Sequence, residues 1–230
     1  MAVLPPLSLA CLMLHGIGPV PPHVGEDEIP YWVSRETFAF ILGLMRQIPA
    51  RLTFDDGNAS DAAIALPALI DARMTASFFI PTARIGTPGY VDENDIRALH
   101  GAGMEIGSHG CTHQRWTEMS DSEIAQDVTA SVERLSAIIG EPVRTAAIPF
   151  GHCDRRVLAV LRRLGLTRVY SSFRGPDSDA RWLVRRDCIT AGLDEAEIRT
   201  LLTRKPALAE SALTLLKSWR RAGNAALWAA

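Results

Sequence analysis

Short apolar segments alternate with helical segments along most of the chain, and this alternation limits the possible folds more than any other feature. Apolar runs predict strands at 9–14, 51–54, 76–80, 104–107, 143–148, 167–171 and 182–189. Helical spacing of apolar residues predicts helices after Ser34, at 60–73, at 92–102, after Ser120, at 154–164 and at 194–203. Strands separated by helices pair in parallel, so the pattern predicts an α/β fold, either an open doubly wound sheet or a closed barrel.

Three local signals set helix boundaries within this pattern. Ser34 can cap the helix that follows it, and Ser120 with Glu123 forms the capping box of a long helix that we expect to end at Gly140. Pro67 falls inside the segment 60–73 and should kink that helix.

Composition indicates an ordinary globular protein. Twenty-four Lys and Arg residues against 26 Asp and Glu residues give a net charge of −2, which argues against nucleic acid or an anionic membrane surface as a partner. No apolar run approaches the ~20 residues of a membrane span. No repeat or linker divides the chain, so we expect one domain over residues 1–230, with an amphipathic helix at about 207–221 as an appendage.

The cysteines and the first residues bear on the compartment. Cys11, Cys111, Cys153 and Cys188 are scattered and form no CxxC pair, as is typical of a reducing compartment. The apolar start of the chain has two prolines and no Lys or Arg before its apolar run, so we interpret it as a strand rather than a signal peptide. These features predict a cytoplasmic location.

Two adjacent carboxylates follow the expected strand 51–54. Asp55 and Asp56 precede Gly57, which can turn the chain. Successive side chains diverge in direction, so one carboxylate can bind a metal while the other transfers a proton. The alternative is an ordinary Asp-Gly turn.

Two histidines follow the expected strand 104–107. His109 and His113 are four residues apart, a spacing that places both on one face of a helical turn. Two imidazoles and one carboxylate form a His₂Asp site suited to a divalent ion such as zinc, with one position left for water. Cys111 should point away from such a site. The alternative is surface or capping chemistry.

A third rigid turn follows the expected strand 143–148. Pro149 and Gly151 flank Phe150, and such a turn can present a backbone N–H to an oxyanion. The alternative is a simple connection between a strand and a helix.

Together these motifs resemble those of the polysaccharide deacetylases, the NodB-homology carbohydrate esterases. TFDDG at 53–57, SHGCTH at 108–113 and IPFG at 148–151 occur in the family's order, and the resemblance covers about residues 9–190. It implies a distorted (β/α)₇ barrel that removes acetyl groups from N-acetylated sugars with a divalent metal. By this resemblance Asp55 is the catalytic base, Asp56, His109 and His113 hold the ion, and the Phe150 N–H helps to bind the oxyanion.

The sequence departs from the family pattern at two positions. Ala147 stands where the family's third motif begins with arginine, and no histidine follows His152 to supply the late Leu-x-x-His motif of the general acid. Leu12 and His15 form such a motif near the N-terminus. In a closed barrel the first and last strands are neighbours, so His15 can take the missing position, as in a circular permutation. Exopolysaccharide-type members of the family resemble this arrangement.

Late residues offer further candidates. Arg185 or Arg186 can supply the positive charge missing at Ala147 and keep Asp55 ionised, unless the pair faces solvent. Trp182 can stack on a sugar or belong to the core.

We therefore expect a metal-dependent hydrolase that deacetylates an N-acetylated carbohydrate or polysaccharide. Zinc is the favoured ion, with cobalt, nickel and manganese as alternatives. Two other functions fit the same residues: a glycan-binding barrel with weak or no activity, and a metal-dependent amidohydrolase that cleaves C–N bonds in non-sugar compounds.

Overall fold

The computed structural model describes residues 8–175, 177–178 and 181–204, so the helix expected at 207–221 lies outside the described residues. The strands are β1 (Ser8–Leu14), β2 (Gly16–Ile17), β3 (Trp32–Val33), β4 (Ala50–Asp55), β5 (Ser77–Ile80), β6 (Glu105–Ser108), β7 (Thr145–Ala147), β8 (Arg168–Tyr170), β9 (Asp177–Ser178), β10 (Leu183–Val184) and β11 (Asp187–Cys188). The α-helices are α1 (Arg35–Met45), α2 (Leu66–Ala72), α3 (Glu93–Gly101), α4 (Asp121–Ile139), α5 (Arg155–Arg163) and α6 (Glu195–Thr203).

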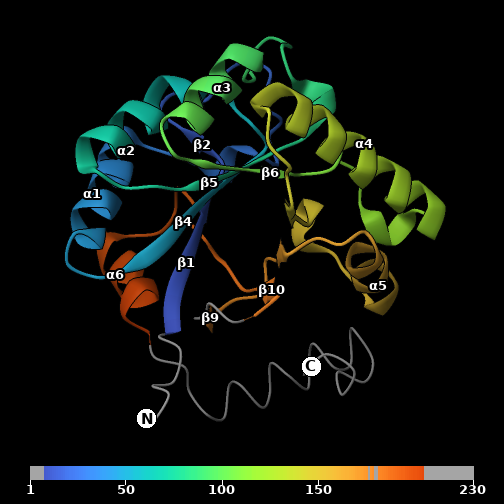
Figure 1. Cartoon of the computed structure of the whole chain (residues 1–230). Helices are drawn as coiled ribbons and strands as arrows, with labels where there is room; N and C mark the ends of the chain where they lie inside the picture. Colours follow the sequence, from blue (N-terminus) through green and yellow to red (C-terminus); the bar gives the residue numbers. More distant parts are fainter. Residues whose placement is uncertain (1–7, 176, 179–180, 205–230) are drawn as a thin grey trace, which may run out of the picture.

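A curled parallel sheet forms the centre of the molecule, in the order β10-β8-β7-β6-β5-β4-β1-β11 (Figure 1). The short strand β9 pairs antiparallel with β1. Helices cover the outer face of the sheet. The predicted distorted (β/α)₇ barrel is confirmed.

The strand expected at 182–189 is divided in two, and this division closes the barrel. Leu183 and Val184 pair with β8, whereas Asp187 and Cys188 pair with Leu12 and Met13 of β1. One extended segment therefore bridges the two edges of the sheet. The first strand lies beside the last, as the permuted arrangement requires.

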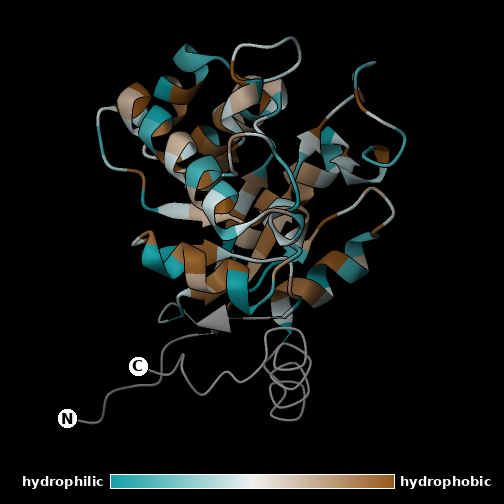
Figure 2. Cartoon of the chain, turned by 90° about the vertical axis from the view of Figure 1, so that its right-hand side faces the viewer, coloured by the Kyte–Doolittle hydropathy of each residue, from teal (hydrophilic) through white to brown (hydrophobic). Residues whose placement is uncertain are grey.

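The core has an outer and an inner part. Between sheet and helices, apolar side chains such as Leu12, Phe54 and Phe78 are fully buried. Inside the barrel a smaller cluster consists of Cys11, Phe79, Ala147, Tyr170 and Val184. Helices in Figure 2 carry both hydrophilic and hydrophobic colours along their length, as expected for helices that cover a sheet.

Helix boundaries follow the expected signals, with one difference. The Ser34 side chain accepts a hydrogen bond from the Thr37 N–H, and the capping box of Ser120 and Glu123 is present. The segment expected as a helix at 60–73 instead begins with a π-helical turn, Asp61–Ala65, before α2. Pro67 has no N–H to continue an α-helical ladder, and the π-turn lies directly before it.

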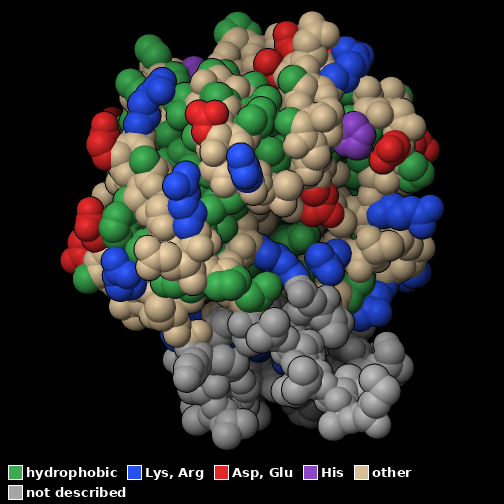
Figure 3. Space-filling model, turned by 60° about the vertical axis from the view of Figure 1, so that its left-hand side comes forward, with side chains coloured by type: hydrophobic (Ala, Val, Ile, Leu, Met, Phe, Trp, Pro, Cys, Tyr) green, Lys and Arg blue, Asp and Glu red, His purple; other side chains and the backbone are tan. Residues whose placement is uncertain are grey.

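The outer surface agrees with the near-neutral composition. Acidic and basic side chains are interspersed on the face shown in Figure 3. Among the described helices, none has both the length and the apolar character needed to cross a bilayer.

Candidate active site

The carboxyl ends of four strands bring together the residues that the sequence singled out. His15 follows β1, Asp55 ends β4 with Asp56 directly after it, and His109 follows β6. The turn Pro149–Gly151 follows β7. Functional groups of parallel α/β barrels lie at this end of the sheet, because the loops that follow the strands meet there.

Asp56, His109 and His113 form a group that we call the metal triad. One ligand atom from each residue lies within 4.8 Å of the others. The Oδ1 atom of Asp56 lies 3.0 Å from Nε2 of His113 and 3.6 Å from Nε2 of His109. This buried Oδ1 still accepts no aligned hydrogen bond from the described residues. The three atoms therefore converge on a common point rather than on one another, as ligands of a metal ion do.

The orientation of His109 also suits a metal. Its Nδ1 lies 3.0 Å from the Ala147 carbonyl oxygen, which can only accept a hydrogen bond. The proton of the neutral ring is therefore on Nδ1, and Nε2 presents its lone pair to the triad. Burial lowers the pKa of His109 to about 4, although Asp55 opposes this shift, so the ring is neutral at pH 7.

The two histidines meet in a way the sequence did not predict. Residues 109–113 form no helical turn, so the expected helical face is wrong. Positive φ angles at Gly110 (73°) and His113 (53°) reverse the chain and bring the two rings to 4.9 Å between centroids. Asp127 on α4 holds the loop, because its carboxylate accepts hydrogen bonds from Thr112 and from the Trp116 indole.

Backbone strain is concentrated at the site. Four described non-glycine residues have a positive φ, and three of them are Asp56 (79°), His113 (53°) and Phe150 (57°). The fourth, Arg73, ends α2. A left-handed conformation costs a side-chain-bearing residue roughly 1–2 kcal/mol, and such strain persists mainly where function requires the geometry.

Arg186 pairs with Asp55 in the closed interior of the barrel. Its Nη1 and Nη2 donate to the two carboxylate oxygens at 2.6 and 2.8 Å. The guanidinium is fully buried, lies near the rings of Phe79 and Tyr170, and also donates from Nε to the Ser171 carbonyl at 3.0 Å. Of the two arginines left open by the sequence, Arg186 therefore makes the contact.

Both adjacent carboxylates are held in the ionised form. Burial acts to raise the pKa of Asp55, but Arg186 and His109 outweigh it and lower the pKa below the usual value. Burial also opposes ionisation of Asp56, yet the neighbouring His113, His15 and His109 lower its pKa. Asp55 is thus a carboxylate whose two oxygens are both engaged by Arg186.

His15 lies next to Asp55 in the barrel. Leu14 pairs with Phe54, so the next residues, His15 and Asp55, leave neighbouring strands at the same level. The His15 ring lies 4.9 Å from the Tyr31 ring, and its buried Nδ1 has no hydrogen-bond partner among the described residues. His15 is one of the neighbours that lower the pKa values of Asp55 and Asp56.

The turn Pro149–Gly151 forms one side of the site. The Phe150 ring is 51% exposed and lies 4.6 Å from the His113 ring, with the Arg115 guanidinium 5.2 Å from the Phe150 ring centre. Pro149 in the same turn is buried. The turn therefore adjoins the metal triad.

Two candidates from the sequence lie outside this cluster. Trp182 precedes β10, donates from its indole to the Leu166 carbonyl at 2.8 Å and stacks under Arg162. These partners lie before β8, at the opposite end of the strands, so Trp182 belongs to the packing there and not to a sugar site. Arg185 is half-buried and does not take the place of Arg186 beside Asp55.

Sequence reasoning missed three residues around the site. Arg84 follows β5 and contacts His113, Asp127 supports the histidine loop, and Asp61 is buried beyond Asp56. Two signals could have found the first two of them. Arg84 is a polar residue in the loop after a parallel strand, and Asp127 is an aspartate on the buried face of an amphipathic helix. Burial and the nearby Asp56 and Asp55 raise the pKa of Asp61 well above its usual value.

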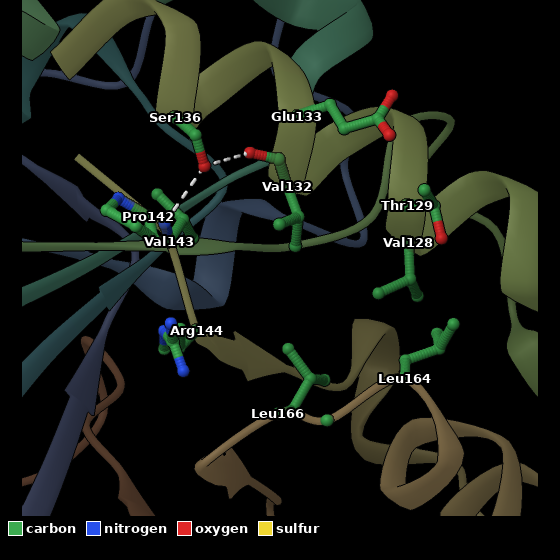
Figure 4. Close-up of a pocket in the computed structure, with 11 residues that line it drawn as sticks. Val128, Thr129, Val132, Glu133, Ser136, Pro142, Val143, Arg144, Leu164 and Leu166 are labelled. Carbon is green, nitrogen blue, oxygen red and sulfur yellow. Dashed lines mark hydrogen bonds between the residues drawn. The ribbon is translucent and has the colours of Figure 1, made fainter. Parts of the chain in front are cut away.

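A separate hollow of about 430 Å³ lies between α4 and the loops that precede β7 and β8 (Figure 4). Val128, Val132, Arg144 and Leu166 are among its lining residues. It is at the amino-terminal end of the strands, away from the metal triad.

Comparisons with known proteins agree with this architecture. The polysaccharide deacetylase family model matches residues 45–169, more than half of the chain. Chitin deacetylase 1 of Cryptococcus neoformans is 23% identical over 118 residues, which are 51% of this chain and 24% of that protein. The chain thus spans about a quarter of the length of this relative.

Solved structures share the fold over nearly the whole chain. Deacetylase PplD of Streptococcus pyogenes, in complex with acetate, has a TM-score of 0.76 at 18% identity and covers 87% of this chain and 100% of its own. A polysaccharide deacetylase from Bacillus cereus has a TM-score of 0.77 at 17% identity over 86% of this chain and 70% of its own. IcaB from Ammonifex degensii has a TM-score of 0.72 at 20% identity over 86% of this chain and 97% of its own.

Proposed function

Because the chain belongs to the polysaccharide deacetylase family, we propose that it removes acetyl groups from an N-acetylated carbohydrate by metal-dependent hydrolysis. The observation that carries the proposal is the convergence of Asp56, His109 and His113 beside an ionised Asp55. Two imidazoles and a carboxylate favour zinc, and cobalt, nickel or manganese also accept such ligands. A divalent ion held there supplies a Lewis acid for the acetyl carbonyl and lowers the pKa of a bound water.

Asp55 is suited to accept the proton of the attacking water. A general base must be ionised at the working pH and within reach of the reacting water. Arg186 keeps the carboxylate ionised and fixes its orientation through both oxygens. The same contact replaces the positive charge that is absent at Ala147.

The reaction also needs an oxyanion donor and an acid for the leaving amine. We assign the backbone N–H of Phe150, in the strained turn beside His113, to the oxyanion. His15 would donate the proton that the departing amine requires, since an unprotonated amide nitrogen is a very poor leaving group. Its place beside Asp55 on the neighbouring strand supports this role.

Acetate release tests the proposal. The purified protein would be incubated with N-acetylglucosamine oligomers and, separately, with small N-acetyl amides that contain no sugar, before and after chelation and after zinc is restored. Acetate from the oligomers that disappears on chelation and returns with zinc is the expected result. Release from the small amides alone would indicate the non-sugar amidohydrolase, and binding of oligomers with no release would indicate a glycan-binding barrel.

A further inference from the structure

We propose that Arg84 is a movable cation that competes with the metal for the triad, and that it must leave His113 before the ion can bind. This inference rests on the proposed metal site and adds a residue that controls how tightly the ion is held. Arg84 lies in the short helical turn Thr82–Arg84 that follows β5.

The Arg84 guanidinium already contacts two members of the metal triad. Its Nη2 lies 3.1 Å from Nδ1 of His113, and its Nη1 lies 3.6 Å from Oδ1 of Asp56. The Tyr90 ring supports the guanidinium from one side, at 4.9 Å from its centre. Arg84 therefore places a permanent positive charge beside the carboxylate that a metal ion would neutralise.

The Arg84 guanidinium and a metal ion cannot both bind the His113 ring, because they either require its proton on different nitrogens or compete for the same nitrogen. A guanidinium only donates, so Nδ1 of His113 must accept, and the proton of the neutral ring is on Nε2. A neutral histidine that binds a metal through Nε2 carries its proton on Nδ1, where Arg84 now lies. Binding through Nδ1 would displace Arg84 directly. Either way the ion and Arg84 cannot hold His113 together.

His109 shows the opposite arrangement and serves as an internal comparison. Its Nδ1 faces the Ala147 carbonyl, an acceptor that suits the metal-bound form of the ring. Only one of the two histidines is thus prepared for the ion, and the other is held by Arg84.

Arg84 is held at the site by His113, Asp56 and Tyr90, and part of its side chain is exposed. Its side chain is 22% exposed, and the buried Nη1 has no hydrogen-bond partner within the described parts of the chain. The Nη2 contact with His113 and the stacking on Tyr90 hold the guanidinium. Removal of its charge should strengthen metal binding, because like charges about 4 Å apart repel strongly in a partly buried site.

Equilibrium zinc titration against a competing chelator tests this inference without any substrate. Arg84→Gln and Arg84→Met remove the charge, and Arg84→Lys keeps it. Arg97→Gln serves as the matched control. It removes an exposed arginine whose hydrogen bonds within the described residues go to Glu93, Asn94 and the Ile138 carbonyl. We expect the Gln and Met variants to bind zinc at least about tenfold more tightly than wild type, with Lys and the control within about threefold.

A structure with zinc bound gives a second readout, in which the Arg84 guanidinium should lie beyond hydrogen-bond distance of His113 Nδ1. Unchanged or weaker zinc affinity in both uncharged variants would overturn the inference, as would an intact Arg84–His113 contact in the zinc-bound protein. If wild type binds zinc but the variants do not differ from it, only the role of Arg84 fails. If neither wild type nor the uncharged Arg84 variants bind the ion, the proposed metal site fails with it.

Discussion

Arg186 and Asp55 are joined by two hydrogen bonds, of 2.6 and 2.8 Å, across the interior of the barrel. The arginine comes from the segment that closes the barrel, and the aspartate ends β4. Arg186 thus supplies a positive charge beside Asp55 from another part of the chain, whereas the family resemblance predicts an arginine at the position of Ala147. The pair links closure of the barrel to the ionisation and orientation of the proposed base.

We expect Arg186→Lys to lower the rate of deacetylation at least about tenfold, because an ammonium group cannot reproduce the two parallel hydrogen bonds. The loss should be larger at acidic pH, since the weaker contact of a lysine leaves the effect of burial, which raises the pKa of Asp55, less fully opposed. Rate against pH, with zinc content measured on the same samples, checks the prediction.

Arg185→Lys is the control for this experiment, because it makes the same chemical change one residue away. Equal rates for Arg186→Lys and wild type across the pH range would show that Asp55 does not depend on this pair.

His15→Ala should slow the hydrolysis of amides strongly and that of an activated acetyl ester much less. The leaving amine needs a proton, whereas an activated alcohol leaves without one, so the loss of a general acid affects only the first reaction. Rates on both substrates with the same enzyme preparation measure the difference. Equal losses on the two substrates would assign His15 a structural role.

Gly110→Ala should destabilise the protein by roughly 2 kcal/mol or more, because its φ of 73° disfavours a side chain and the new Cβ would lie 2.4 Å from the Asp127 carboxylate. Gly43→Ala is the control, because Gly43 lies within α1 and a Cβ added there would meet no described atom within 4 Å apart from its chain neighbours and the helix's own backbone. This substitution should stabilise the protein by about 0.5–1 kcal/mol. Urea unfolding measures both. A Gly110→Ala variant as stable as wild type would contradict the described loop geometry.

Asp61→Asn should stabilise the metal-free protein, increasingly so at higher pH. Neither carboxylate oxygen has a partner among the residues described, and burial raises the pKa. As pH rises above about 4, the unfolded chain releases this proton while the folded protein retains it, so wild-type stability falls by at most about 1.4 kcal/mol per pH unit. The Asp61→Asn variant has no carboxyl group at this position, so its free energy of unfolding lacks this fall with pH.

Urea unfolding in the presence of a chelator, from pH 5 to pH 8, measures the difference in slope. Asp71→Asn, at an exposed position on α2, is the matched control and should follow wild type. Parallel curves for Asp61→Asn and wild type would mean that Asp61 ionises normally.

The alternation of strands and helices predicted an α/β fold with a parallel sheet, and the resemblance of three motifs to the deacetylase family favoured the barrel over an open sheet. The capping box at Ser120 was accessible from a local signal, and the neighbouring places of β1 and the last strand followed from closure of the barrel. The loop conformation that brings His109 and His113 together could not be predicted, because it depends on residues with positive φ and on Asp127 from a distant helix. The contact of Arg84 with His113 and the choice between Arg185 and Arg186 could not be predicted either, because both depend on the directions of side chains inside a closed barrel.

Trp182 illustrates the same limit. The sequence left Trp182 open between a sugar site and the core. Trp182 precedes β10 and therefore lies at the opposite end of the barrel from the residues that follow their strands. Only the direction of the strand, which follows from its pairing with β8, separates the two ends.

Zinc content and acetate release, measured together on the same preparations of wild type, Asp55→Asn and His113→Ala, test the central claim most directly. Wild type should hold one ion and release acetate from N-acetylglucosamine oligomers. Asp55→Asn should keep the ion and lose two or more decades in rate, the scale of about 10²–10⁴ for a general base. His113→Ala should lose both. Full zinc occupancy in His113→Ala, or undiminished acetate release by the protein stripped of metal, would contradict the account.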